Sequence, residues 1–452
     1  MKRVALFLLI AALLLVGCSK STSATAQSHT TDQVNYMQLA VSASDKLSSE
    51  QFGDLYAMFD DDLQKNLTEN ELKWAWAQLL FKMGSFQYYS SDFTVANVNN
   101  TMLASIPFTF QSSTIDIHLS FNKQGEISGL YFDSTAANHK ISPRLPNDQE
   151  IVIGTEPWRL SASLTLPEGE GPFPAVILLQ DAGPSDRNEQ IGPNLPFYDL
   201  ANQLSQKGIA VLRYDKRTYT YANEMLALED MTIVDELLFD AIAAYQQLSA
   251  ISKIDSQQIY VLGHGFSGML LPMLHDYLPN AAGYIMLTAP ARPAYETLYD
   301  QVAYILSLDT TATAENKADI LEEVQQTAQN IQNLTPESTL SSDELLGAPV
   351  SYWLSLAEYQ PLQAVQSIQK PLLLLYGGRD YQVTADDLSL WQQALAHSPN
   401  AAFKVYSNLN HLLMTGVGKS NPAEYQTKGT VSEEVSQDIA AFIQQASQNS
   451  YN

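Results

Sequence analysis

The stretch V-L-G-H-G-F-S-G-M-L-L-P, residues 261–272, decides the fold of this chain. It continues the apolar run Q-I-Y-V-L at 258–262, whose β-branched and aromatic side chains predict a buried strand. Three glycines then interrupt the apolar pattern and indicate a tight turn. The apolar residues after the turn predict the start of a buried helix. The sequence thus predicts a strand, a sharp glycine-rich turn and a helix in immediate succession.

This order of elements resembles the nucleophile elbow G-x-S-x-G of α/β-hydrolases, in which a strained turn exposes a serine Oγ above the sheet. In this chain the place of that serine is Gly265. Ser267 is an alternative nucleophile, but that register puts Met269 where the motif requires glycine, and the strand must run two residues longer. Ser267 fits better in the first turn of the helix, as a small residue or a cap. We therefore predict that the nucleophile position is vacant.

Outward from the turn, residues 150–452 alternate predicted strands with predicted helices, which is the pattern of an α/β fold. Several strands are continuous apolar runs, as expected for parallel strands covered on both faces. The stretch 291–366 has mostly helical patterns and no strand signal, and we expect a helical lid there. The predicted strands are 159–166, 175–179, 210–214, 259–262, 284–288, 372–376 and 403–406, and the main helices are 197–207, 233–249 and 432–446.

Two late loops carry candidates for the acid and the base of a Ser-His-Asp triad. On this kind of sheet the acid and then the base follow the nucleophile, each on a loop at the carboxyl edge. Asp380 follows the strand at 372–376, and we predict that it is the acid rather than a residue that caps its own turn. His411 follows the strand at 403–406, and we predict that it is the base rather than an incidental surface histidine.

The oxyanion hole is expected after the strand at 175–179, from Asp181 and Ala182, together with Phe266 after the elbow. At this point the chain resembles a family of bacterial α/β-hydrolases described as esterases, dienelactone-hydrolase-like or serine-aminopeptidase-like proteins. The resemblance runs from about residue 150 to the C-terminus and implies a doubly wound, mostly parallel sheet. Its stretches are G-P-S-D-R-N-E-Q-I-G-P-N-L-P-F, V-L-R-Y-D-K-R-T, G-H-G-F-S-G-M-L-L-P, A-P-A-R-P, G-G-R-D-Y-Q-V and L-N-H-L, in this order.

Three positions depart from the family pattern, and we expect all three at the reacting centre. The oxyanion loop begins Gln180-Asp181 instead of His-Gly, and the elbow serine is Gly265. Glycine removes the attacking oxygen and adopts the positive φ of the elbow without strain. A carboxylate at 181 opposes the negative charge that an acyl-transfer transition state develops. The sequence leaves open whether the Asp181 side chain points away from the site.

Two functions follow from these departures. The first is a non-catalytic hydrolase relative that binds a small-molecule or peptide ligand, or a partner, in the old pocket. The alternative is an active carboxylic-ester or peptide hydrolase that uses the displaced nucleophile Ser267 with Asp380 and His411.

The N-terminus resembles a bacterial lipoprotein signal. Met1-Lys2-Arg3 is basic, residues 4–16 are a continuous apolar run, and Leu-Val-Gly precedes Cys18, the only cysteine of the chain. A signal peptide at 1–17 and two acyl chains on Cys18 would anchor the protein stably to a membrane, outside the cytoplasm. Residues 18–35 are polar and are expected to form a flexible tether.

Residues 36–133 predict a separate small α+β domain. The capping-box patterns S-x-x-Q at 48–51 and T-x-x-E at 68–71 predict two helix starts. Four β-runs follow, at 92–97, 102–110, 114–122 and 126–132, the last two joined by the turn N-K-Q-G. The layout resembles the cone-shaped domain of the nuclear-transport-factor type, and a polar linker is expected at 134–149.

Bulk properties limit the partners. The 452 residues carry a net charge of −25, which argues against nucleic acid and against anionic lipid surfaces. Neither a phosphate-binding loop nor a metal-ligand cluster is apparent in the spacing, so we expect no cofactor and no metal. The charged runs Asp-Arg at 186–187 and Asp-Lys-Arg at 215–217 are interpreted as members of ion pairs that brace loops, with substrate contacts as the alternative.

Overall fold

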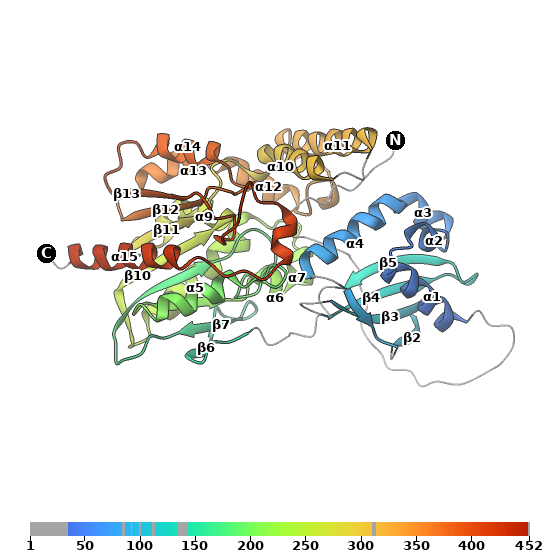
Figure 1. Cartoon of the computed structure of the whole chain (residues 1–452), viewed down its shortest axis with the longest axis horizontal. Coiled ribbons are helices and arrows are strands. Elements are labelled where there is room, and N and C mark those ends of the chain that lie inside the picture. The colour runs from blue at the N-terminus through green and yellow to red at the C-terminus, as the bar shows by residue number, and fades with distance from the viewer. Residues whose placement is uncertain are drawn as a thin grey trace.

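The computed structural model describes residues 35–450, apart from 84–85, 92, 99–100, 111–113, 134–142 and 310–312. The described residues form one five-stranded and one eight-stranded sheet. Figure 1 shows each sheet with its own set of helices. The predicted signal peptide, nearly all of the tether and most of the predicted linker lie outside the described residues.

The small domain is four helices followed by an antiparallel sheet. The sequence predicted helices before strands, but only two helix starts. In the sheet the strand order is β1-β3-β4-β5, and β2 pairs with β3. Residues alternate between buried and half-buried along β3 and β4, so one face of the sheet packs on the helices. The elements are α1 Tyr36–Ser48, α2 Phe52–Tyr56, α3 Asp61–Asn66, α4 Glu69–Met83, β1 Phe86–Tyr89, β2 Thr94–Val98, β3 Thr101–Phe110, β4 Thr114–Phe121 and β5 Ile127–Asp133.

Local predictions in this domain were partly right. Helix α4 begins directly after Thr68, and the turn after Asn122 joins two antiparallel strands, with the Asn122 carboxamide oxygen accepting from two backbone N–H groups of the turn. The predicted helix start at Ser48 was wrong. Ser48 ends α1, and its hydroxyl donates to the carbonyl of Asp45, a helix-end arrangement that the capping pattern does not distinguish. Strand β1 was not predicted.

The large sheet has the strand order β13-β12-β11-β10-β8-β9-β7-β6. Strands β8 to β13 are parallel, whereas β7 runs antiparallel to both β9 and β6. All seven predicted strands are present, and β6 is an edge strand that the sequence reading missed. The strands are β6 Asp148–Ile153, β7 Leu160–Thr165, β8 Phe173–Leu179, β9 Ala210–Tyr214, β10 Ile254–His264, β11 Gly283–Leu287, β12 Leu372–Gly377 and β13 Ala401–Tyr406.

Helices cover both faces of this sheet. Along β8, residues 175, 177 and 179 face one apolar core with helices α8 and α9, and residues 176 and 178 face the other core with α5 and α15. This period of two on a strand buried on both sides explains its unbroken apolar sequence. The helices of the large domain before β11 are α5 Pro196–Ser205, α6 Arg217–Thr220, α7 Ala222–Leu226, the π-helix η1 Val234–Leu238, α8 Phe239–Ser249 and α9 Gly265–Tyr277, and those after β12 are α14 Ala385–Ala394, η4 Pro422–Gln426 and α15 Glu433–Ser450.

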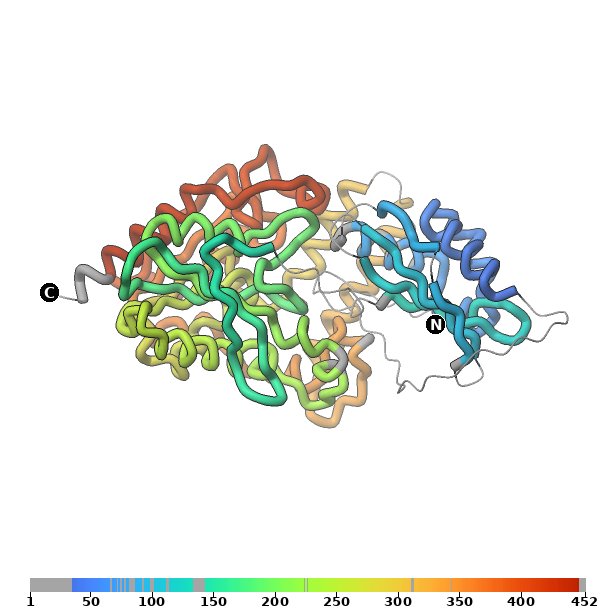
Figure 2. The backbone as a smooth tube through the Cα atoms, turned by 90° about the horizontal axis from the view of Figure 1, so that it is seen from below, coloured from blue at the N-terminus to red at the C-terminus, as the bar shows by residue number. Residues whose placement is uncertain are grey.

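The insertion between β11 and β12 is helical, as predicted for a lid. Its members are α10 Ala294–Leu308, α11 Ala314–Gln332, η2 Ser342–Glu344, α12 Val350–Glu358, α13 Pro361–Ala364 and η3 Val365–Ser367. In Figure 2 the lid lies on the side of the large domain that faces the small domain, whereas α15 runs toward the opposite end. None of the described helices has both the length and the apolar character needed to cross a membrane.

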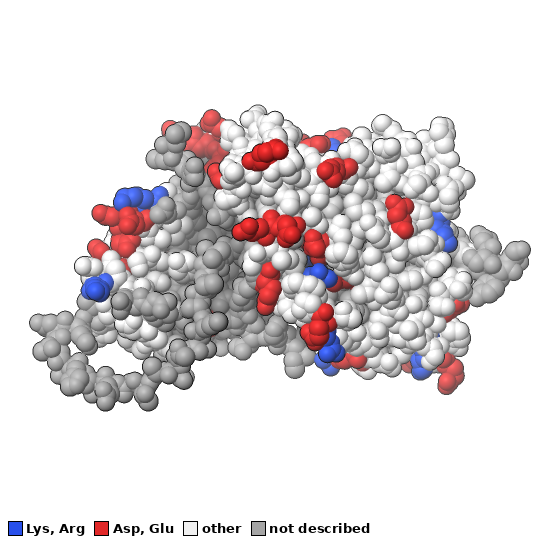
Figure 3. Space-filling view, turned by 180° about the vertical axis from the view of Figure 1, so that it is seen from behind, with Lys and Arg blue, Asp and Glu red and all other residues white. Residues whose placement is uncertain are grey.

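The acidic composition is visible on the surface. Figure 3 shows acidic side chains spread over one face of the large domain, with few basic ones between them. This agrees with the net charge of −25.

Candidate active site

The central turn has the geometry of a nucleophile elbow without a nucleophile. Strand β10 ends at His264, helix α9 begins at Gly265, and Gly265 has a φ of 51°. That left-handed conformation favours glycine over any residue with a side chain. Strand β10 extends two residues beyond the predicted end, which the Ser267 register required. The helix nevertheless starts before Ser267, which is fully buried and donates its hydroxyl to the carbonyl of Gln180.

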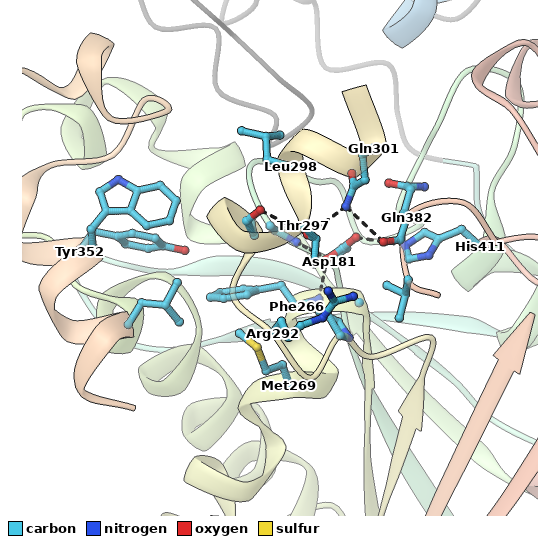
Figure 4. Close-up of a pocket in the computed structure, with 17 residues that line it drawn as sticks. Asp181, Phe266, Met269, Arg292, Thr297, Leu298, Gln301, Tyr352, Gln382 and His411 are labelled. Atoms are coloured by element: carbon cyan, nitrogen blue, oxygen red, sulfur yellow. Dashed lines mark hydrogen bonds and ion pairs between the residues drawn. The ribbon is translucent and has the colours of Figure 1, made fainter. Parts of the chain in front are cut away.

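The Asp181 carboxylate lies in the oxyanion hole itself. Its Oδ1 accepts hydrogen bonds from the backbone N–H of Phe266 at 2.6 Å and of Ala182 at 2.7 Å. Its Oδ2 lies 3.3 Å from Nε2 of His411. The side chain therefore points into the site, which the sequence had left open. Figure 4 shows Asp181 between Phe266 and His411.

Asp181 also fills the space of any side chain at position 265. A Cβ built on Gly265 lies 2.2 Å from both Cγ and Oδ1 of Asp181. Such a distance is far inside van der Waals contact, so one of the two groups has to move. Glycine at 265 and aspartate at 181 are thus sterically complementary, and neither departure from the family pattern is independent of the other.

The predicted acid and base are in contact. Nδ1 of His411 lies 2.6 Å from Oδ2 of Asp380, and both residues are buried at the carboxyl ends of β12 and β13. Burial by itself lowers the pKa of His411, but the carboxylates of Asp380 and Asp181 outweigh it and raise the pKa to about 10. For Asp181 the directions are reversed. Burial raises the pKa of its carboxyl group, but the hydrogen bond and charge of His411 hold that pKa well below its usual range.

A second buried pair, which the sequence analysis did not identify, supports the site from below. Nδ1 of His264 lies 2.9 Å from Oε1 of Glu189, and its Nε2 lies 3.1 Å from the carbonyl oxygen of His411. The same Glu189 oxygen accepts the backbone N–H of Asp181 at 2.7 Å. Glu189 has a φ of 53°, an uncommon conformation for glutamate that these contacts hold in place. The only signal in the sequence was its place in the G-P-S-D-R-N-E-Q stretch.

Among the described residues, one group of side chains has the spacing of metal ligands. The expectation, from sequence spacing, that no such group exists was wrong in this respect. Ligand atoms of Asp181, His264 and His411 lie within 4.8 Å of one another. Sequence spacing missed the group because its members come from three separate segments of the chain, two loops and the end of β10. Both nitrogens of His264 are already hydrogen-bonded, and Asp380 takes Nδ1 of His411, so the cluster fits an internal hydrogen-bond network better than an ion.

Gln180 does not belong to the reacting centre, contrary to the expectation for all three departures. Its side chain is fully buried, and its amide donates to the carbonyls of Asp186 and Tyr214. It therefore braces the base of the oxyanion loop.

The charged residues around this loop form ion pairs, as interpreted from the sequence. Arg187 contacts Asp215 at 2.8 Å and Glu150 at 2.9 Å. Lys216 contacts Glu236 at 2.7 Å and Arg217 contacts Asp240 at 2.5 Å. Asp186 instead accepts backbone N–H groups within its own loop.

A cavity of about 80 Å³ lies between Asp181 and the lid. Its wall is mainly apolar, and Figure 4 shows the lid residues Tyr352 and Leu298 across the cavity from His411. The polar side chains in the wall are Asp181, Arg292, Thr297, Gln301, Gln382 and His411. The cavity gives Asp181 access to a ligand, because about a third of its side chain, 34%, is exposed.

Two family models match parts of this chain. The family model for a protein of unknown function, DUF3887, matches residues 40–130, and the dienelactone hydrolase family matches residues 338–446. Two solved esterases, Est1E from Butyrivibrio proteoclasticus and an esterase of Pyrococcus furiosus, are 15% and 16% identical with a TM-score of 0.41 each. Both cover 66% of this chain, which covers 98% and 90% of theirs.

A curated relative decides the family. Esterase EstD of Thermotoga maritima is 32% identical over 402 residues, which cover 88% of this chain and 92% of that protein. The match is longer than the large domain, so it extends into the small domain and is not confined to the α/β fold. This chain belongs to the esterase family of α/β-hydrolases that includes EstD.

Proposed function

We propose that this protein is a non-catalytic member of its esterase family, anchored by lipid at Cys18 outside the cytoplasm, that binds a small ligand in the cavity above Asp181. One observation carries the proposal. The Asp181 carboxylate fills the oxyanion hole and the space of the missing serine at the same time.

Serine-dependent ester hydrolysis requires three things that this site lacks together. No hydroxyl stands at position 265, and loss of the nucleophile alone costs on the order of a millionfold in kcat. Both N–H donors of the hole are occupied by Asp181, and loss of a single donor costs roughly a hundredfold or more. His411, with a pKa raised to about 10, is protonated at neutral pH and does not accept a proton there.

The alternative is an active ester or peptide hydrolase that uses Ser267 with Asp380 and His411. The name of the relative EstD and the intact His411–Asp380 pair favour it. The burial of Ser267 and its hydrogen bond to the Gln180 carbonyl weigh against it, because that hydroxyl has to leave both the helix turn and its acceptor to attack a substrate.

A fluorophosphonate probe separates the two functions. We expect no labelling of the native protein and no turnover of simple aryl esters. The double variant Asp181→Gly with Gly265→Ser is the positive control, because it restores a hydroxyl and empties the hole while keeping Asp380 and His411. Labelling of the native protein that disappears in Ser267→Ala would establish the alternative.

The anchor is tested separately. Cells fed a labelled fatty acid are expected to incorporate it into the native protein and not into Cys18→Ala, because Cys18 is the only cysteine. Equal labelling of the two proteins contradicts the anchor and leaves the site proposal unaffected.

A further inference from the structure

The backbone donors of the oxyanion hole are in use. The N–H groups of Phe266 and Ala182 both donate to Oδ1 of Asp181, and the N–H of Asp181 donates to Glu189. Nε2 of His411 faces Oδ2 of Asp181. A ligand that needs donors, such as a carboxylate or an ester carbonyl, meets a fixed carboxylate instead. The Asp181 carboxylate thus occupies the position that the carboxylate product of ester hydrolysis would take.

The charged groups of the site, two buried carboxylates and the partly exposed Asp181, leave an excess of negative charge. Asp181, Asp380 and Glu189 are three carboxylates in contact with two histidines, His264 and His411. Even with both imidazoles protonated the sum is −1, and any neutral imidazole makes it more negative. A desolvated excess charge is costly, and a cation in the adjoining cavity reduces that cost.

Neighbouring cations do not cancel the excess, because each has its own acidic partner. Arg292, in the cavity wall, makes two hydrogen bonds to Asp387 at 3.1 and 2.8 Å. Lys216, behind the oxyanion loop, pairs with the buried Glu236 at 2.7 Å.

The cavity offers an apolar and aromatic enclosure for the rest of the ligand. Rings of Phe266, Tyr352 and Trp353 line it together with aliphatic side chains. Aromatic faces stabilise organic cations. A volume of about 80 Å³ holds roughly five to eight water-sized groups, which corresponds to a chain of about four to six carbons.

We propose that the ligand of this cavity is a small primary alkylammonium ion, whose charge pairs with Oδ2 of Asp181 and whose chain fills the apolar space under the lid. Oδ2 is the oxygen that the two backbone donors leave free, and its neighbour is Nε2 of His411 at 3.3 Å. A carboxylate oxygen accepts more than one hydrogen bond, so an ammonium group adds a donor on the side of the cavity. This assignment rests on the proposed binding function and names its ligand class.

Calorimetric titration of the full-length protein with three probes of one chain length tests the assignment. The probes are n-pentylammonium, 1-pentanol and pentanoate. We expect pentylammonium to bind at least tenfold more tightly than pentanol, and pentanoate not to bind detectably. The assignment is overturned if pentanol binds as tightly as pentylammonium, if pentanoate binds more tightly than pentylammonium, or if no probe binds.

Two substitutions of Asp181 sharpen the test. Asp181→Asn keeps an oxygen acceptor for both N–H groups and removes the charge, so the preference for pentylammonium over pentanol should fall at least tenfold. Asp181→Gly frees both N–H groups beside His411, so the preference should invert toward pentanoate. Glu358→Gln is the matched control, because it also removes one negative charge, but at an exposed position at the end of lid helix α12. It should leave all three affinities unchanged.

The assignment and the proposed function fail in different ways. Probe labelling or ester turnover by the native protein contradicts the non-catalytic function whatever the titrations show. Without turnover, an unchanged pentylammonium affinity in Asp181→Asn contradicts only the ammonium assignment.

Discussion

Residues 181 and 265 compete for one volume. The clash distance of 2.2 Å means that the carboxylate is accommodated because residue 265 has no Cβ. Glycine also supplies the positive φ of the elbow, where an L side chain costs roughly 1–2 kcal/mol. The pair therefore behaves as one structural unit.

This coupling is measurable in a double-mutant cycle. Gly265→Ala in the native background should lower the free energy of unfolding by roughly 1–3 kcal/mol, because the new methyl group overpacks against Asp181. In the Asp181→Gly background the same change should cost clearly less, with a coupling energy on the order of 1 kcal/mol or more. Urea denaturation of the four proteins gives the result, and additive effects would refute the shared volume.

The pH dependence of stability reports the charge on His411. In the unfolded chain His411 titrates near its ordinary value of about 6.5, and in the folded protein its pKa is raised to about 10. Its contribution is therefore fully present below the unfolded value and is lost as the pH rises through about 10. We expect the unfolding free energy to fall between about pH 7 and about pH 10, by on the order of a few kcal/mol at most.

The matched variant for this measurement is Asp181→Asn, which removes one of the two carboxylates that raise the pKa of His411. Its unfolding free energy should fall less over the same interval, in denaturation experiments at both pH values. An identical fall in the two proteins would show that Asp181 does not hold the charge of His411.

At the scale of elements, the oxyanion loop is held in place by ion pairs that join it to strands distant in sequence. Arg187 connects the loop to Glu150 on β6 and to Asp215 after β9. The Arg187 side chain is almost completely buried, so its two carboxylate partners rely on it for charge compensation. Glu189, two residues later in the same loop, positions the backbone of Asp181.

Arg187→Ala should therefore be strongly destabilising, by on the order of 3 kcal/mol, because it leaves carboxylates with less charge compensation in a partly buried place. The matched control is Arg159→Ala. Arg159 is exposed, with Glu156 at 3.6 Å, and its loss should cost less than about 1 kcal/mol. Chemical denaturation compares the two variants, and similar losses would mean that the Arg187 pairs do not brace the loop.

At the scale of the whole molecule, two domains have separate hydrophobic cores. One core lies within the small domain, and the two others lie on either face of the large sheet. Helix α4 of the small domain and η4 of the large domain approach each other, as Figure 1 shows. Separate cores are the physical condition for independent folding.

Fragments 36–133 and 134–452 should accordingly each unfold cooperatively. Circular dichroism during heating is the measurement, with the full-length protein as the reference. Cooperative melting of the full chain together with non-cooperative melting of both fragments would show that the domains share a necessary interface.

The sequence by itself determined the fold class, the positions of nearly all strands along the chain, the vacancy at residue 265, and the places of Asp380 and His411. These features are encoded locally, in apolar runs of strand length, in glycine-rich turns and in the position of a loop after its strand. The edge strands β1 and β6 and the end of α1 were missed, because short runs and capping patterns do not distinguish alternative pairings.

Only the tertiary structure decided what Asp181 does. Its contacts with Phe266 and His411 join residues 85 and 230 positions apart, and no local pattern encodes the direction of a side chain across such distances. The same holds for the Glu189–His264 pair and for Gln180, which turns into the loop rather than toward the site. A sequence motif shows which residues reach the carboxyl edge of the sheet, whereas packing and burial of charge decide which of them occupy the oxyanion hole.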